Sequence, residues 1–169
     1  SSFGILPKEE MLEVRPNLKS LQIGIPKESS FQENRVSLTP DSVGLLVNNG
    51  HNVIIESGAG NACSFSDDEY AKQGAKVTYS RDEVYKTDFL LKIEPPTKSE
   101  LKLMQPNQNL ISAVQLNTQD ADYFQILIKK NITALAFEFI QDSQMKLPIV
   151  RSMSEIAGNT SVLILIALS

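Results

Sequence analysis

The chain has 169 residues, of which 41% are hydrophobic and 21% charged, so it can bury the core of one domain and is not intrinsically disordered. Its formal net charge of −4 argues against nucleic acid as a partner, and its single cysteine and single histidine leave no residues for a zinc cage. It has neither a secretory signal nor an apolar run long enough to cross a bilayer. We therefore expect a cytoplasmic protein with no direct membrane contact and no bound metal.

Short apolar strands alternate with helices along most of the chain, after an irregular N-terminal extension at residues 1–20. The expected strands lie at 21–25, 52–56, 76–79, 88–93, 109–114 and 132–137, and the expected helices at 39–50, 66–74, 80–83, 97–104 and 119–130. This alternation is typical of βαβ units. It predicts a Rossmann-like α/β fold, in which a doubly wound and mainly parallel sheet carries helices on both faces.

Several helices begin with a recognisable capping pattern. Thr39 offers a capping hydroxyl and is followed by proline and aspartate, which suit the first helical turn. The runs 66–69 and 80–83 each start with serine and end with glutamate, as in a capping box. We expect these positions to begin helices.

The C-terminal part of the chain changes character after residue 140. Residues 141–147 are expected to form a polar linker that Pro148 ends, and a helix is expected from Ser154 into the apolar C-terminal run. That helix has no cap and an apolar end, so it needs something to pack against. We therefore assign residues 21–150 to the domain, interpret 151–169 as the start of a helix leading out of it, and expect a longer protein.

Polar residues at the ends of the predicted strands are the candidate site. Arg35 lies in the loop after the first strand, where doubly wound folds bind ligands, and a guanidinium can hold a small carboxylate by two parallel hydrogen bonds. Lys92 and Glu94 close the strand 88–93 and, being two apart, would share one face. They could form an ion pair or position a ligand. Gln115 occupies the equivalent end of the next strand.

Three other features are interpreted as structural. The glycine loop 58–60 is not followed by the third glycine and the immediate helix start of a dinucleotide fingerprint, so we expect an ordinary tight loop. His51 has no catalytic partner at a motif spacing, and Cys63 is expected to be a small packing residue.

Three segments taken together carry a family resemblance: IGIPKESSFQENRVSLTP at 23–40, NGHNVIIESGAGNACSFSDDEYAKQGAKV at 49–77, and SMSEIAGN at 152–159. In this order they resemble the N-terminal domain of the alanine dehydrogenase and pyridine-nucleotide transhydrogenase family. The resemblance implies a Rossmann-like domain that binds a small carboxylate or amino acid. It also implies that NAD or NADP is bound by a further domain absent from this chain, and that the full-length protein is a homo-oligomer.

Only some of the family's site residues are matched by the same residue type in this sequence. Arg35 matches the carboxylate-binding arginine of the family, and Met153 matches the methionine of its M-S-E-[VI]-A-G segment, which lines the site. Lys92 matches the first lysine of the pattern LLKVKEP, but the substrate lysine of that pattern falls on Glu94. Likewise the catalytic histidine falls on Gln115, so two groups that alanine oxidation would be expected to need are replaced.

Several functions stay open at this stage. The first is an NAD(P)-dependent oxidoreductase like alanine dehydrogenase, of which this chain is the N-terminal substrate domain, inactive alone. The second is a transhydrogenase alpha subunit, which the loss of lysine and histidine favours, although residues 147–158 are nearer the alanine dehydrogenase pattern. Lysine-forming saccharopine dehydrogenases are a weaker third enzyme, and a non-catalytic domain that senses a small carboxylate is the alternative outside enzymes.

Overall fold

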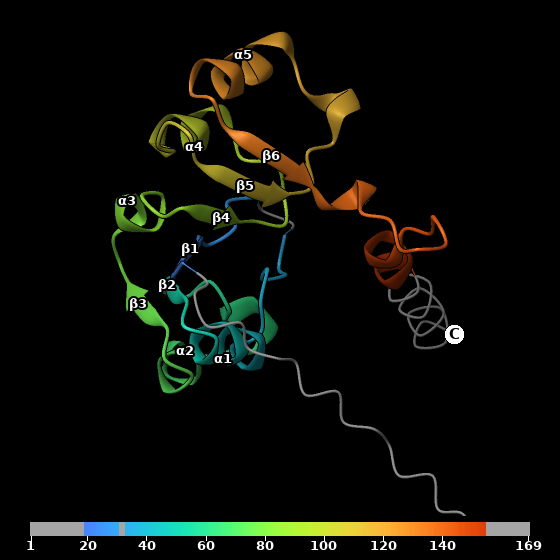
Figure 1. Ribbon diagram of the computed structural model, residues 1–169. Coiled ribbons are helices and arrows are strands. Elements are labelled where there is room, and N and C mark those ends of the chain that lie inside the picture. The colour runs from blue at the N-terminus through green and yellow to red at the C-terminus, as the bar shows by residue number, and fades with distance from the viewer. Residues whose placement is uncertain (1–18, 31–32, 155–169) are drawn as a thin grey trace, which may run out of the picture.

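A six-stranded, all-parallel sheet forms the centre of the domain in the computed structural model, which describes residues 19–30 and 33–154 (Figure 1). The strands are β1 (Gln22–Ile25), β2 (Asn52–Glu56), β3 (Lys76–Thr78), β4 (Phe89–Leu91), β5 (Asn109–Ser112) and β6 (Thr133–Ala136). Their order in the sheet is β3-β2-β1-β4-β5-β6, and every neighbouring pair is parallel. This is the strand order of the doubly wound Rossmann fold, so the predicted fold class is confirmed.

Helices cover both faces of the sheet (Figure 1). They are α1 (Pro40–Asn48), α2 (Asp67–Lys72), α3 (Arg81–Val84), α4 (Lys98–Leu103) and α5 (Ala121–Lys129), with short 3-10 turns at Asn61–Cys63, Leu116–Thr118 and Phe137–Phe139. Helices α1 and α2 pack on one face with Ile23, Ile25 and Ile55. Helices α3, α4 and α5 pack on the other.

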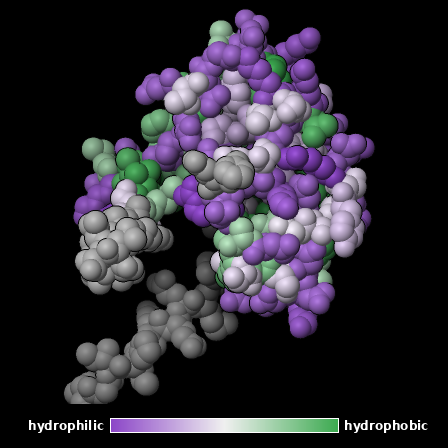
Figure 2. All heavy atoms as spheres, turned by 180° about the vertical axis from the view of Figure 1, so that it is seen from behind, coloured by the Kyte–Doolittle hydropathy of each residue, from purple (hydrophilic) through white to green (hydrophobic). Residues whose placement is uncertain are grey.

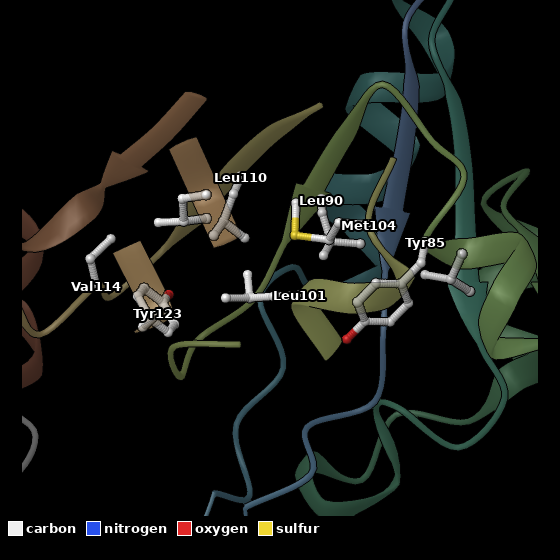
Figure 3. Close-up of a cluster of buried hydrophobic side chains, with 9 residues drawn as sticks. Tyr85, Leu90, Leu101, Met104, Leu110, Val114 and Tyr123 are labelled. Carbon is white, nitrogen blue, oxygen red and sulfur yellow. The ribbon is translucent and has the colours of Figure 1, made fainter. Parts of the chain in front are cut away.

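The core on the second face joins α3, α4 and α5 to β4 and β5 (Figure 3). Tyr85, Leu90, Leu101 and Leu110 have no exposed surface, and Tyr123 of α5 packs beside them. Because each apolar side chain of this size contributes about 1.5–3 kcal/mol when fully buried, this cluster is a main source of the stability of this half of the domain.

Gly24 shows why β1 lies so close to α3. A Cβ built on Gly24 would meet the carbonyl oxygen of Val84 at 2.3 Å and the hydroxyl of Thr87 at 2.5 Å. A real side chain does not fit at these distances, so only glycine lets the central strand and the crossover segment approach each other. The flanking Ile23 and Ile25 point to the opposite face.

Capping signals in the sequence predicted most of the helix starts. The Thr39 hydroxyl accepts a hydrogen bond from the Ser42 backbone, and Ser66 forms the expected capping box with Glu69. The expected capping box at 80–83 was wrong, because the Ser80 side chain makes no capping bond and the following helix is a single turn. Glu83 instead binds Lys76 and the hydroxyl of Thr78, 2.7 Å away, on the neighbouring strand.

Two other expected boundaries are also corrected. Strand β4 ends at Leu91 and not at residue 93, because the backbone N–H of Ile93 donates to the side chain of Glu28 on the loop after β1. A helix occupies residues 148–154, so the expected start at Ser154 was six residues late. Pro148 holds its first position, which suits a residue without a backbone N–H. The rest of the expected C-terminal helix lies outside the described residues, and no helix within the described ones is long and apolar enough to cross a membrane.

Candidate functional site

The candidate site lies where the strand order reverses, between β1 and β4. The chain leaves β1 toward α1 and β2, and leaves β4 toward α4 and β5, so the loops after β1 and β4 diverge to opposite faces of the sheet. Ligands of open α/β sheets bind in this crevice outside the carboxyl ends of the strands. Arg35 lies on the first loop, and Lys92 and Glu94 lie on the second.

Arg35 is held by a carboxylate from its own loop. Its Nε donates to Oε1 of Glu33 at 2.8 Å, and its Nη2 donates to Oε2 at 2.5 Å. This bond holds the pKa of the Glu33 carboxyl below its usual range. Glu33 binds only the edge of the guanidinium formed by Nε and Nη2, so Nη1 has no hydrogen-bond acceptor among the described residues. Arg35 therefore has a fixed orientation and keeps donors for a ligand carboxylate.

Glu94 lies between Arg35 and Gln115. Its Oε1 is 3.9 Å from Nη2 of Arg35, and its Oε2 accepts a long hydrogen bond, 3.4 Å, from Nε2 of Gln115. Burial raises the pKa of Glu94, and the neighbouring carboxyl of Glu33 raises it further. The structure thus brings Arg35, Glu94 and Gln115 together, as expected for strand ends at one edge of the sheet.

Lys92 does not join this group, and the interpretation that Lys92 and Glu94 share one face was wrong. Lys92 is 1% exposed, and its ammonium contacts Glu28 at 2.8 Å and Glu100 at 3.5 Å. Glu100 also pairs with Arg81 at 2.5 Å. Burial alone would raise the pKa of Glu100, but the charges of Lys92 and Arg81 and a backbone hydrogen bond lower it overall.

This buried network connects the two loops of the site. The Oε1 atom of Glu28 accepts the backbone N–H of Ile93 at 2.7 Å, so the loop after β1 is bonded twice to the segment after β4. Glu100 is itself the capping-box residue of α4 with Thr97, and it accepts from Ser29 on the first loop. Lys92 therefore positions the loop that carries Arg35, and its ammonium group is engaged by Glu28 and Glu100 although the residue lines the second cavity of the site.

Gln115 has an unusual backbone for a residue other than glycine. Its φ is +50° and its ψ is 54°, in the left-handed region, which costs about 1–2 kcal/mol. The backbone N–H groups of Val114 and Gln115 both donate to Oε1 of Glu138, at 2.8 and 2.9 Å. Glu138 follows β6 and stabilises this conformation, which aims the Gln115 side chain back toward Glu94.

Two adjacent cavities open at this site. The larger, about 870 Å³, is lined by Arg35, Gln115, Glu138 and Met153 among others. The second, about 470 Å³, is more apolar and shares Arg35 and Met153 with the first. Met153 belongs to the helix at 148–154, and Figure 2 shows apolar surface gathered on this part of the chain, beside the grey atoms at the left. Met153 and Arg35 therefore line the same two cavities.

The residues of this domain do not fit a dinucleotide. A pyrophosphate is bound where a short glycine-rich turn leads from β1 directly into a helix N-terminus. Here residues 26–39 separate β1 from α1 and contain no glycine. In the glycine loop 58–60, Gly60 packs instead against Phe65 and Tyr70. Within residues 19–30 and 33–154, no group of three or more histidine, cysteine, aspartate or glutamate side chains could hold a metal ion.

Sequence reasoning missed three carboxylates that contact the candidate residues: Glu28, Glu33 and Glu138. Glu138 carries the same signal as Gln115, a polar residue directly after a strand expected from the sequence, at 132–137 and 109–114 respectively. Glu28 and Glu33 lie in the same loop as Arg35, but only the fold shows what they contact. The residues interpreted as structural have structural contacts: Nδ1 of His51 accepts the backbone N–H of Leu21 at 3.4 Å, and Cys63 donates to a loop carbonyl.

Comparison with known proteins gives a consistent family match. The family described as alanine dehydrogenase/PNT, N-terminal domain, matches residues 24–157. An alanine dehydrogenase of Methanococcus maripaludis is 38% identical over 141 residues, which is 83% of this chain and 38% of that protein. An alanine dehydrogenase of Staphylococcus epidermidis is 34% identical over the same shares. The chain thus spans 38% of the length of these relatives.

Solved structures agree with the sequence matches. A structure of an L-alanine dehydrogenase superimposes with a TM-score of 0.81 at 36% identity, covering 85% of this chain and 40% of that one. A transhydrogenase from Sinorhizobium meliloti superimposes with a TM-score of 0.67 at 26% identity, covering 73% of this chain and 37% of that one.

Proposed function

Because the chain belongs to the family of alanine dehydrogenase/PNT N-terminal domains, we propose that it is the substrate domain of an NAD(P)-dependent oxidoreductase similar to alanine dehydrogenase. The observation that carries this proposal is Arg35, oriented by Glu33 at the rim of a cavity of about 870 Å³ with its Nη1 atom available. A small amino acid or 2-oxo acid would place its carboxylate on that edge.

The contribution of this domain to the reaction is position and charge. When bound, nicotinamide supplies the hydride chemistry, and we propose that NAD or NADP is held outside this domain, whose β1 loop does not fit a dinucleotide. Arg35 anchors the carboxylate, and Gln115 offers an amide beside the reacting carbon. Met153 and the apolar lining of the second cavity exclude water around the side chain of the substrate.

A transhydrogenase is the second candidate. It is favoured by the structural match to the Sinorhizobium meliloti protein and by Glu94 and Gln115, which replace the lysine and histidine expected of an alanine site. A nicotinamide reduction assay on the full-length protein with L-alanine separates the two enzymes. We also expect the full-length protein to be cytoplasmic and homo-oligomeric, and residues 1–169 alone to be inactive.

The test of the carboxylate site is Arg35→Lys in the full-length protein, with substrate titration beside a melting curve. Lysine keeps the charge but loses the planar fork, so affinity for a carboxylate ligand should fall about ten- to a hundredfold, the equivalent of one charged hydrogen bond. The melting temperature should barely change, because the Arg35 side chain is 49% exposed. Unchanged affinity with a lowered melting temperature would show that Arg35 is structural. Binding without any hydride transfer would favour a sensor.

A further inference from the structure

The surroundings of Arg35 carry an excess of negative charge. Its guanidinium is paired with Glu33 at 2.5 Å and lies 3.9 Å from Glu94, so one positive charge faces two carboxylates. The nearby ammonium of Lys92 does not correct this balance, because Glu28 and Glu100 hold it in the buried network. A ligand with only a negative charge would therefore enter an unfavourable local field.

Of the two carboxylates near Arg35, Glu94 is the one that can accept a further hydrogen bond from a ligand. Glu33 makes two short bonds to Arg35 and its side chain is 6% exposed, whereas Glu94 is 33% exposed. Its 3.9 Å approach to Arg35 and its 3.4 Å bond from Gln115 are not strong hydrogen bonds, and the carboxyl of Glu33 lies beside it. A carboxylate has about four acceptor positions, so Glu94 can accept a cationic donor without losing these contacts. Burial and Glu33 raise its pKa, and a cation bound beside it would relieve this effect.

We infer that Glu94 makes this site selective for a ligand that carries an ammonium group next to its carboxylate, a zwitterionic α-amino acid, over the matching 2-oxo acid. The carboxylate binds the open edge of Arg35, and the ammonium group binds Glu94. This inference rests on the proposed function, since it assigns the ligand class of the same carboxylate site.

The guanidinium of Arg35 and the carboxylate of Glu94 are close enough to bind the two charged groups of such a ligand together. Nη2 of Arg35 and Oε1 of Glu94 are 3.9 Å apart, and the two charged groups of an α-amino acid share one carbon, so both can be bound at once. A 2-oxo acid has a neutral carbonyl in place of the ammonium group. It would bring a second negative charge toward Glu94 with nothing to offset the repulsion.

The test is calorimetric titration of the full-length protein at neutral pH with amino acids and their 2-oxo acids in pairs, beginning with L-alanine and pyruvate. The wild type, Glu94→Gln and Glu94→Lys are compared, with Asp122→Asn as a control because Asp122 is an exposed carboxylate on α5. We expect the wild type to bind the amino acid more tightly. Glu94→Gln should weaken amino-acid binding about tenfold and strengthen 2-oxo-acid binding, and Glu94→Lys should do both more strongly. The control should bind like the wild type.

The outcomes separate this inference from the proposed function. If Arg35→Lys weakens binding of both ligand classes but Glu94→Gln leaves their affinity ratio unchanged, the carboxylate site stands and the selectivity assigned to Glu94 is wrong. If no member of any pair binds the wild type, both are wrong. A Glu94→Gln variant that binds both classes more tightly would also overturn the inference, because Glu94 would then only neutralise Arg35.

Discussion

Removing the ammonium group of Lys92 should destabilise the fold far more than removing an exposed lysine. Lys92→Met keeps an unbranched side chain of similar length in a position that is 1% exposed, but it leaves the Glu28 carboxylate without its 2.8 Å cation. Breaking a buried ion pair in this way costs about 3–5 kcal/mol, because a charge stays buried without compensation.

The contacts that remain after Lys92→Met place its cost in stability near the lower end of the range for broken buried ion pairs. Glu100 keeps Arg81 at 2.5 Å after Lys92 is removed, and Glu28 keeps the backbone N–H of Ile93 at 2.7 Å. Only Glu28 loses its cation outright, so we expect the free energy of unfolding to fall by about 3 kcal/mol. Lys92→Met combined with Glu28→Gln should recover most of this loss, since no unpaired charge then remains on the loop.

The assay is urea unfolding monitored by circular dichroism. It compares the wild type, Lys92→Met, the double variant and Lys98→Met. Lys98 pairs with Asp120 at 2.5 Å on the surface, and its loss should leave the unfolding midpoint almost unchanged. A Lys92→Met midpoint as close to wild type as that of Lys98→Met would refute the reasoning. So would a double variant less stable than Lys92→Met alone, because an uncompensated Glu28 charge could not then be the cause.

Three further predictions concern stability. Burial and the neighbouring carboxyl of Glu33 raise the pKa of Glu94, so the ionised form of Glu94 destabilises the folded state above its raised pKa. Glu94→Gln should therefore raise the melting temperature at neutral pH. This increase in melting temperature should vanish as the pH falls below the usual carboxyl range. Gly24→Ala should cost about 3 kcal/mol in urea unfolding, because its Cβ would lie 2.3 Å from the Val84 carbonyl oxygen, whereas Gly50→Ala, at φ +85° in open space, should cost about 1 kcal/mol. Tyr123→Phe should change the free energy of unfolding by less than about 0.5 kcal/mol, since its buried hydroxyl has no hydrogen-bond partner among the described residues; a loss above 1 kcal/mol would indicate one.

Local patterns in the sequence were sufficient for the architecture. Alternating strands and helices predicted the parallel sheet, and the capping residues Thr39 and Ser66 predicted helix starts that the structure confirms. These signals work because the groups that cap a helix lie within three residues of each other. Ser80 shows the limit, since Glu83 binds Lys76 and Thr78 on the adjacent strand and is not available to its own helix start.

Some of the candidate site residues could also be predicted from the order of strands along the sequence. Parallel strands end at one edge of the sheet, so the polar residues that follow them, Arg35, Glu94 and Gln115, could be expected to meet, and they do. Spacing within one strand could not show that Lys92 turns away from them, because strand β4 ends at Leu91.

The sequence by itself therefore determined the fold class and the edge of the sheet at which Arg35, Glu94 and Gln115 meet. Only the tertiary structure decided how the charges divide: Lys92 is neutralised in the buried network by Glu28, 64 positions away, while Arg35 is left facing Glu33 and Glu94. The physical reason is that charge pairing depends on distances of a few ångströms between segments that are remote in the sequence. Those distances exist only once β1 and β4 lie side by side.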